Sequence, residues 1–143
     1  AIHEADRHYL GKKAAKTNRE SLLNLGIENP DDFADLLNGL PEPDILLKDG
    51  DRVFNTPLQV VETPGHTRCG IYLYGEKEGI LFSGDSLFFM GIGRTDLPGG
   101  DEKTLLEAIR TRILVLPPET RVFPGHGLDT TVERDIKGNP FVR

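Results

Sequence analysis

Short apolar runs separated by Gly and Pro lie in the middle of the chain, and each run is too short for a helix. Their composition predicts strands at residues 58–62, 71–74 and 80–82, with a further brief strand at 121–123. Since these runs are apolar without a regular polar alternation, we expect both faces of the resulting sheet to be buried.

A hairpin is predicted just before these strands. Residues 45–47 and 52–54 are apolar or extended in character, and they flank the turn sequence Asp49, Gly50 and Asp51. An Asp-Gly pair between two such runs is a strong local signal for antiparallel pairing of the flanking segments.

The first part of the chain predicts helices. Residues 4–26 are mostly helix formers and indicate a broken helix. A short helix is expected from Pro30, with an apolar stripe of Phe33, Leu36 and Leu37 and a stop at Gly39.

The last third of the chain predicts two more helices. A helix from residue 102 to about residue 113 carries apolar residues on one stripe, and Asp101 is placed to cap it. Thr130 and Glu133 have the spacing of a capping box and predict a last short helix.

Composition narrows the class of protein. A chain of 143 residues fits one domain. Seventeen basic against 23 acidic residues give a net charge of −6, and this balance argues against nucleic-acid binding. No apolar run is long enough to cross a membrane, and a single cysteine, Cys69, fits a reducing cytoplasm. The chain opens at Ala1 without a methionine, as expected of an internal fragment.

One sequence pattern occurs twice. Residues 60–66 and 121–126 both run from a strand through Pro and Gly to a histidine, and the strand at 80–82 leads through Ser and Gly to Asp85. Strand ends gather into sites in α/β sheets, so His66, Asp85 and His126 can converge. Imidazole and carboxylate groups bind zinc, iron or manganese. The spacing also fits plain tight turns and a capping Asp, and both interpretations stay open.

The other candidate residues have bland interpretations beside the functional ones. His3 and His8 are one residue too far apart for a zincin motif and are assigned to the surface. Cys69 is interpreted as a small buried apolar residue and not as a nucleophile. Arg94 lies in a glycine-rich stretch, where it can hold an anion or form a salt bridge to Asp96 or Asp101.

Phe88, Phe89 and Met90 follow Asp85 closely. They can form an apolar wall beside that carboxylate, although residues of these types are more often plain core.

Four blocks of sequence together resemble the metallo-β-lactamase fold hydrolases, most of all the small glyoxalase II type. The blocks are residues 63–67, 83–88, 91–100 and 123–127. The resemblance implies a mixed α/β (α+β) fold, an αββα sandwich, with a site for two divalent metal ions, zinc or alternatively iron or manganese. It implies His66 on the first metal, Asp85 bridging both and His126 on the second. The implied activity is hydrolysis of a small-molecule thioester such as hydroxyacylglutathione, with Arg94 gripping the glutathione carboxylate.

Two departures from that family pattern change the expectation. The family's H-x-H-x-D-H motif is not found in the sequence, so residues 1–143 are expected to be a single domain forming the later two thirds of the fold. Leu128 stands where glyoxalase II has a tyrosine that contacts glutathione. We therefore expect weak or absent metal, no turnover for this chain alone, and self-association through an exposed sheet edge.

Two other functions stay open at this point. A relative of persulfide dioxygenases would hold one iron and would not need His126 as a ligand. A metal-free domain would serve as a binding or structural module. Metal content separates these alternatives, since two ions per chain indicate the hydrolase and one iron indicates the dioxygenase.

Overall fold

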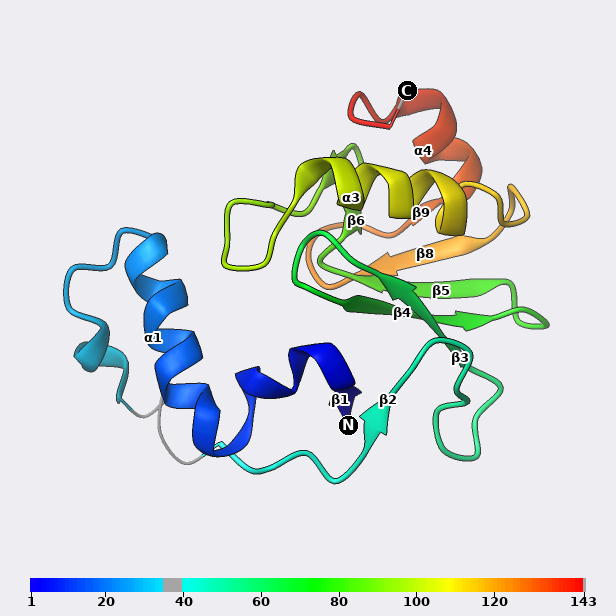
Figure 1. Ribbon diagram of the computed structural model, residues 1–143. Helices are drawn as coiled ribbons and strands as arrows, with labels where there is room; N and C mark the ends of the chain where they lie inside the picture. Colours follow the sequence, from blue (N-terminus) through cyan, green and yellow to red (C-terminus); the bar gives the residue numbers. More distant parts are fainter. Residues whose placement is uncertain (35–39, 143) are drawn as a thin grey trace.

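The computed structural model describes residues 1–34 and 40–142, and Figure 1 shows their arrangement. The elements in chain order are β1 (Ile2–His3), η1 (Glu4–Tyr9), η2 (Gly11–Lys13), α1 (Ala14–Asn24), η3 (Pro30–Phe33), β2 (Leu46–Leu47), β3 (Gln59–Thr63), β4 (Gly70–Gly75), β5 (Ile80–Gly84), β6 (Leu87–Phe88), β7 (Gly91–Ile92), α3 (Glu102–Ala108), η4 (Ile109–Ile113), β8 (Arg121–Pro124), β9 (Thr130–Thr131) and α4 (Val132–Gly138). None of the helices in these described ranges has the length and apolarity needed to cross a membrane.

A five-stranded sheet in the order β3-β4-β5-β8-β9 is the centre of the fold. The first three strands pair antiparallel in sequence order, β8 joins β5 in parallel, and β9 returns antiparallel to β8. The strands predicted at 58–62, 71–74, 80–82 and 121–123 are confirmed, with ends shifted by one or two residues. The mixed α/β class is confirmed as well.

One face of the sheet is covered by helix α3 and its continuation η4, as Figure 1 shows. Leu105, Ile109 and Ile113 are fully buried there and belong to one apolar cluster with Tyr72 and Leu81 of the sheet. The predicted helix and its apolar stripe are confirmed. The cap is confirmed too, because the backbone N–H of Thr104 donates to Asp101 Oδ1 at 2.7 Å.

The opposite face of the sheet is less buried, which makes the expectation of burial on both faces wrong. Along β5 the side chains alternate, since Leu81 is 1% exposed and Phe82 is 40% exposed. Phe82 stacks on Phe123 of β8 with ring centroids 5.6 Å apart. A run of apolar residues reports the character of each side chain, but not whether a second layer packs on it.

The predicted hairpin between residues 45–47 and 52–54 is also wrong. The turn itself forms, because the N–H of Asp51 donates to the carbonyl of Lys48 at 3.1 Å. The flanking segments take other partners. β2 pairs in parallel with β1, and Arg52 forms a bridge with Gln59 at the start of β3. The turn signal is local, whereas the choice of partner strand is made by residues far away along the chain.

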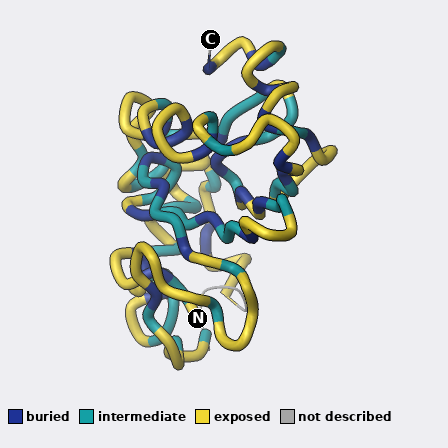
Figure 2. Tube along the Cα trace, turned by 90° about the vertical axis from the view of Figure 1, so that its right-hand side faces the viewer, coloured by how far each residue is buried: buried dark blue, intermediate teal, exposed yellow. Residues whose placement is uncertain are grey.

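The first part of the chain forms a broken helix, as predicted. Two 3₁₀ turns, η1 and η2, lead into α1, in which only Ala14 is buried, and Leu23 is 50% exposed. Figure 2 shows the contrast in burial between this segment and the sheet. The short helix expected at Pro30 begins there as η3. Its predicted stripe at Leu36 and Leu37 and its stop at Gly39 lie outside the described residues.

The last helix, α4, begins one residue later than the capping-box spacing indicates. Thr130 belongs to β9, and the cap is Thr131, whose Oγ1 accepts a hydrogen bond from the N–H of Arg134 at 3.3 Å. Two adjacent threonines make the register of such a cap ambiguous from sequence, and pairing of Thr130 with Val122 in the sheet decides it.

Candidate metal centre

Three strands point toward the same edge of the sheet and end there. β3 and β5 run in the same direction, because each is antiparallel to β4, and β8 is parallel to β5. His66, Asp85 and His126 each follow one of these strands within three residues. The topology therefore brings all three candidate residues to one edge, which is where loops of α/β proteins form sites.

Asp85 and His126 contact each other directly. His126 Nδ1 lies 2.8 Å from Asp85 Oδ1, and the two side chains are 77% and 38% exposed respectively. Gly125 makes this approach possible, because a Cβ at that position would lie 2.3 Å from Asp85 Oδ1. The Pro-Gly of the repeated sequence pattern thus has a packing reason beyond the turn.

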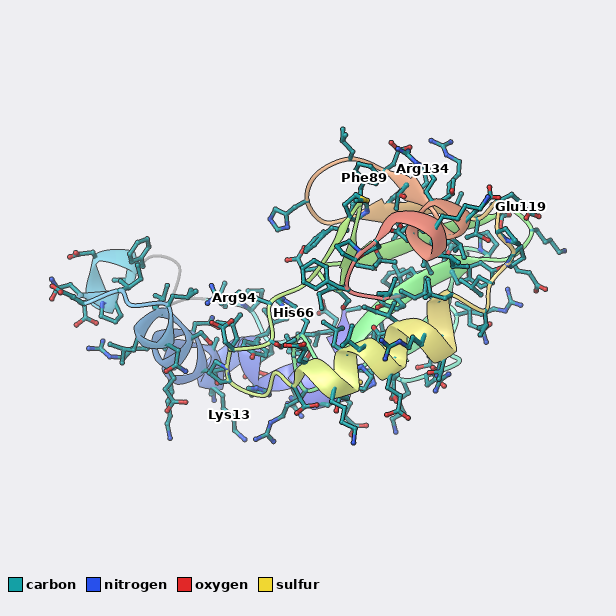
Figure 3. The ribbon with its side chains drawn as sticks, turned by 90° about the horizontal axis from the view of Figure 1, so that it is seen from above. Lys13, His66, Phe89, Arg94, Glu119 and Arg134 are labelled. Carbon is teal, nitrogen blue, oxygen red and sulfur yellow. The ribbon has the colours of Figure 1, made fainter. Side chains whose placement is uncertain are left out.

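His66 is oriented by the glycine-rich stretch at residues 91–100. Its Nδ1 lies 2.7 Å from the backbone carbonyl of Arg94, and Figure 3 shows the two residues together. A carbonyl oxygen only accepts, so Nδ1 carries the ring proton and Nε2 keeps its lone pair. This is the arrangement in which a histidine is ready to bind a metal through Nε2.

Gly93 separates His66 from Asp85. A Cβ on Gly93 would lie 1.8 Å from the backbone carbonyl of Asp85 and 3.2 Å from His66 Nδ1. Only a glycine fits between these two residues, so the glycine-rich stretch serves the site through its backbone.

The side chain of Arg94 is held by its neighbour. Its Nε and Nη2 donate to the two carboxylate oxygens of Asp96 at 2.7 and 2.6 Å. This fork of charged hydrogen bonds lowers the pKa of the Asp96 carboxyl to about 2. The salt bridge to Asp96 that sequence reasoning kept as the alternative is therefore present, and Asp101 caps α3 instead.

Of the three residues expected to form an apolar wall, Phe88 is the one that contacts a residue of the site. The ring of Phe88 meets the ring of His126 edge-on, with centroids 6.2 Å apart. Phe89 lies under the guanidinium of Arg134 at 4.5 Å, and Figure 3 shows this pair. Met90 stays 45% exposed in the turn between β6 and β7 and has a positive φ of 64°.

A second cluster, of residue types that can bind metal, was not predicted from the sequence. His3 was expected on the surface, but it is 6% exposed and its Nε2 lies 2.8 Å from Glu62 Oε1. Cys69 is buried, as expected, with Sγ 3.6 Å from the same nitrogen. No local signal reports this cluster, since its members come from β1, β3 and the residue before β4.

The donor chemistry of His66, Asp85 and His126 fits a divalent metal ion, with two imidazoles and one carboxylate at a common edge. In the structure, however, the donor atoms of these three side chains do not all lie within 4.8 Å of one another. Among the described residues, His3, Glu62 and Cys69 form the only group of three or more such side chains whose donor atoms all lie within 4.8 Å of one another.

Comparison with known families gives one match over most of the chain. The model of a family described as the metallo-beta-lactamase superfamily matches residues 1–126. Among curated proteins, the hydroxyacylglutathione hydrolase GloC of Haemophilus influenzae is 34% identical over 140 residues, which are 98% of this chain and 61% of the relative. The probable metallo-hydrolase YqgX of Bacillus subtilis is 34% identical over 142 residues, 99% of this chain and 62% of the relative.

An uncharacterized protein of Aquifex aeolicus is 41% identical over 103 residues, 71% of this chain and 49% of its own length. The chain thus spans between 49% and 62% of the length of these relatives.

Solved structures agree with this result and confirm the metallo-β-lactamase fold. The B3 metallo-beta-lactamase BLEG-1 superposes with a TM-score of 0.76 at 34% identity, covering 98% of this chain and 63% of that one. TTHA1623, in a di-iron-bound form, superposes with a TM-score of 0.66 at 39% identity, covering 83% of this chain and 59% of that one. ETHE1 from Myxococcus xanthus gives a TM-score of 0.62 at 32% identity, covering 73% and 48% respectively.

Proposed function

The chain belongs to the metallo-β-lactamase superfamily, and from this premise we propose that it contributes to a metal-dependent hydrolase of thioesters such as hydroxyacylglutathione. One observation carries the proposal: His66, Asp85 and His126 lie at one sheet edge, and both histidines have Nδ1 engaged and Nε2 available. The similarity to a hydroxyacylglutathione hydrolase over 98% of the chain supports the choice of substrate class.

In this proposal His66 would hold the first of two divalent metal ions, His126 would hold the second, and Asp85 would be a ligand shared by both. Zinc is the expected metal, with iron or manganese as alternatives, and the di-iron form of TTHA1623 supports iron. Metal ions in such a site supply a bound water with a pKa near 7 as the nucleophile. The chain's own contribution is orientation, since the Arg94 carbonyl and the Asp85 carboxylate keep the ring protons on Nδ1.

Arg94 is proposed to bind the carboxylate of the substrate. Its guanidinium is already shared with Asp96, and its side chain is 45% exposed. A substrate carboxylate therefore has to join or displace the Asp96 carboxylate, which makes Arg94 a modest contributor to affinity.

Two ions need more donors than three side chains, because zinc sites supply three or four protein ligands per ion. We propose that these 143 residues form the later two thirds of a longer fold, and that the rest of that fold supplies the further donors of the complete centre. We expect the reaction to take place in the cytoplasm. Self-association of the chain through a free sheet edge stays a prediction.

A mononuclear iron enzyme of the persulfide dioxygenase type is the second candidate. The contact between His126 and Asp85 favours it, because a strongly exposed histidine that donates to a ligand carboxylate can orient that ligand without binding metal. In that case His66 and Asp85 remain ligands and His126 becomes a positioning residue.

The test uses the full-length protein that carries these residues beside the 143-residue chain. We expect about two metal ions at this centre in each full-length chain and release of thiol from hydroxyacylglutathione. We expect Asp85→Asn to lower the rate of hydrolysis by about 100-fold or more. Loss of a group that only orients a metal ligand already lowers metal affinity or activity by about 10- to 100-fold, and Asp85 is itself a proposed ligand. Asp129→Asn is the matched control, because Asp129 pairs with Arg121. The 143-residue chain alone should hold little metal at His66, Asp85 and His126 and should show no turnover.

Metal content and activity then separate the alternatives. One iron per chain with persulfide oxidation supports the second candidate. A full-length protein without metal and without hydrolysis would overturn the proposal and leave a binding or structural domain.

A further inference from the structure

The cluster of His3, Glu62 and Cys69 joins the start of the chain to two consecutive strands of the central sheet. His3 ends β1, Glu62 lies in β3, and Cys69 immediately precedes β4. The side chain of His3 is 8% exposed, and that of Glu62 is 36% exposed, so the cluster is buried on one side and open to solvent on the other. An ion can therefore reach a group of donors that the fold already holds in place.

We propose that His3 Nε2, Glu62 and Cys69 Sγ form a second metal site, separate from the candidate metal centre, that binds one zinc ion or a similar divalent transition metal. Imidazole, carboxylate and thiolate are the three protein donor types of zinc sites. Three protein ligands leave a fourth tetrahedral position for water, and the exposed side of Glu62 gives that water access.

The distances fit such an ion closely. With Zn–N near 2.0–2.1 Å and Zn–S near 2.3 Å, a tetrahedral angle places nitrogen and sulfur about 3.6 Å apart. The separation of His3 Nε2 and Cys69 Sγ is 3.6 Å. A nitrogen and an oxygen ligand would lie about 3.3 Å apart, so Glu62 Oε1, now 2.8 Å from the ring, has to withdraw by about half an ångström.

The charge around the cluster favours a cation. Burial raises the pKa of the Cys69 thiol to about 12, and the negative charges of Glu62, Asp6 and Asp49 add to the effect. The thiol thus keeps its proton in the absence of a cation. A divalent ion compensates the same negative charges and stabilises the thiolate, as metal binding does for cysteine ligands in general.

Metal binding at this site should release a proton, and this release can be measured. The N–H of Ala5 donates to His3 Nδ1 at 3.2 Å, so the ring proton is on Nε2 and points toward Glu62. When the ion takes Nε2, this proton moves to Nδ1 and the Ala5 bond is given up. The thiol of Cys69 loses its proton to solvent as the metal–sulfur bond forms. One proton is released per ion bound.

An ion at this site would stabilise the loop that carries His66 of the candidate metal centre. Glu62 and Cys69 lie on either side of the loop that carries His66, and both would be fixed to the same ion. The ion would also tie the first strand of the chain to the central sheet through His3. The site is therefore structural and acts on the position of His66.

Cobalt(II) is a suitable probe, because coordination by a thiolate produces an ultraviolet charge-transfer band. The chain has one cysteine, so such a band can arise only from Cys69. We expect the reduced 143-residue chain to bind one cobalt ion with this band, to release one proton per ion, and to lose the band when zinc is added. Cys69→Ser should abolish the band. His3→Gln and Glu62→Gln should each weaken cobalt binding by about tenfold or more.

Asp85→Asn is the control that separates the two sites, and its band should match that of the parent chain. Circular dichroism checks that each variant is folded. Absence of the band at saturating cobalt would overturn the proposal. It would also be overturned if His3→Gln and Glu62→Gln bound cobalt as tightly as the parent chain. If Cys69→Ser does not fold, proton release measured on Asp85→Asn decides the question, since a site without thiolate releases none. None of these outcomes depends on whether the protein hydrolyses a thioester.

Discussion

The sheet region, residues 59–142, and the N-terminal arm, described residues 1–34 and 40–58, are held together by different interactions. The sheet region has an apolar core in which Leu105, Ile109 and Ile113 are fully buried. In the described part of the arm, the buried apolar residues are Ala14, Pro30 and Leu47. Figures 1 and 2 show the consequence, since α1 extends away from the sheet and remains largely exposed.

Polar groups attach the arm to the sheet region. Asp6 is 7% exposed and accepts hydrogen bonds from Thr67 Oγ1 and from the N–H of Cys69. Tyr9 donates to the carbonyl of Pro98 at 3.3 Å, in the same stretch that orients His66. The difference teaches that stability and site geometry have separate origins: the core keeps the sheet folded, and buried polar contacts set how the arm meets the loops of the candidate metal centre.

The largest expected effect comes from the core. Leu105→Ala should lower the free energy of unfolding by about 2–5 kcal/mol, because it removes a fully buried side chain and leaves a cavity. Leu23→Ala in the arm should change it by no more than about 0.5 kcal/mol, because Leu23 is 50% exposed. Urea unfolding followed by circular dichroism measures both. Equal losses for the two variants would contradict the contrast between the regions.

The elements of the sheet region were predictable because their signals are local. The apolar runs gave β3, β4 and β5, and the stripe from Leu105 to Ile113 gave the helix α3 with its cap at Asp101. Pairing was not predictable in the same way. The turn at Gly50 formed, but β2 found its partner in β1, 44 residues upstream in register, and a turn sequence contains no information about that.

The two candidate metal sites differ in the same respect. The repeated strand-Pro-Gly-His pattern led to His66 and His126 because each turn displays its histidine at a strand end. His3 was assigned to the surface because its partners lie 59 and 66 positions away along the chain. Nothing in the residues near His3 reports Glu62 or Cys69, and the pairing of β1 with β2 and the contacts of Asp6 with Thr67 and Cys69 hold it there.

The next prediction separates the arm from the core. Asp6→Asn removes the charged acceptor of Thr67 and Cys69 with little change of volume, and loss of such a buried bond costs about 1–3 kcal/mol. We expect faster amide hydrogen exchange in residues 1–13, by about 5- to 150-fold, and unchanged exchange in α3. Mass spectrometry of the exchanged peptides measures both. Glu4→Gln is the matched control, since Glu4 pairs with Lys48 inside the arm. Acceleration in both variants would show that general charge, and not the Asp6 contact, holds the arm.

The smallest effect is expected at Arg94, in the stretch where the two regions meet. Its ion pair with Asp96 is exposed to solvent, and both partners lie within the glycine-rich stretch at residues 91–100. Breaking this pair should therefore leave the arm attached to the sheet region. Arg94→Gln should raise the pKa of Asp96 from about 2 toward its ordinary value of 3.8. Because the pKa is lowered in the folded chain, the ion pair stabilises fully above about pH 4 and loses its effect as the pH falls toward 2.

NMR titration of the Asp96 carboxyl measures this shift, and hydrogen exchange of residues 1–13 measures attachment of the arm in the same variant. Lys103→Gln, which changes a nearby exposed charge at the start of α3, serves as the control for loss of positive charge alone. If Arg94→Gln accelerated exchange in the arm as strongly as Asp6→Asn does, the exposed ion pair would be part of the attachment. Exchange that stays at the parent rate leaves buried acceptors, with Asp6 foremost, as the groups that hold the two regions together.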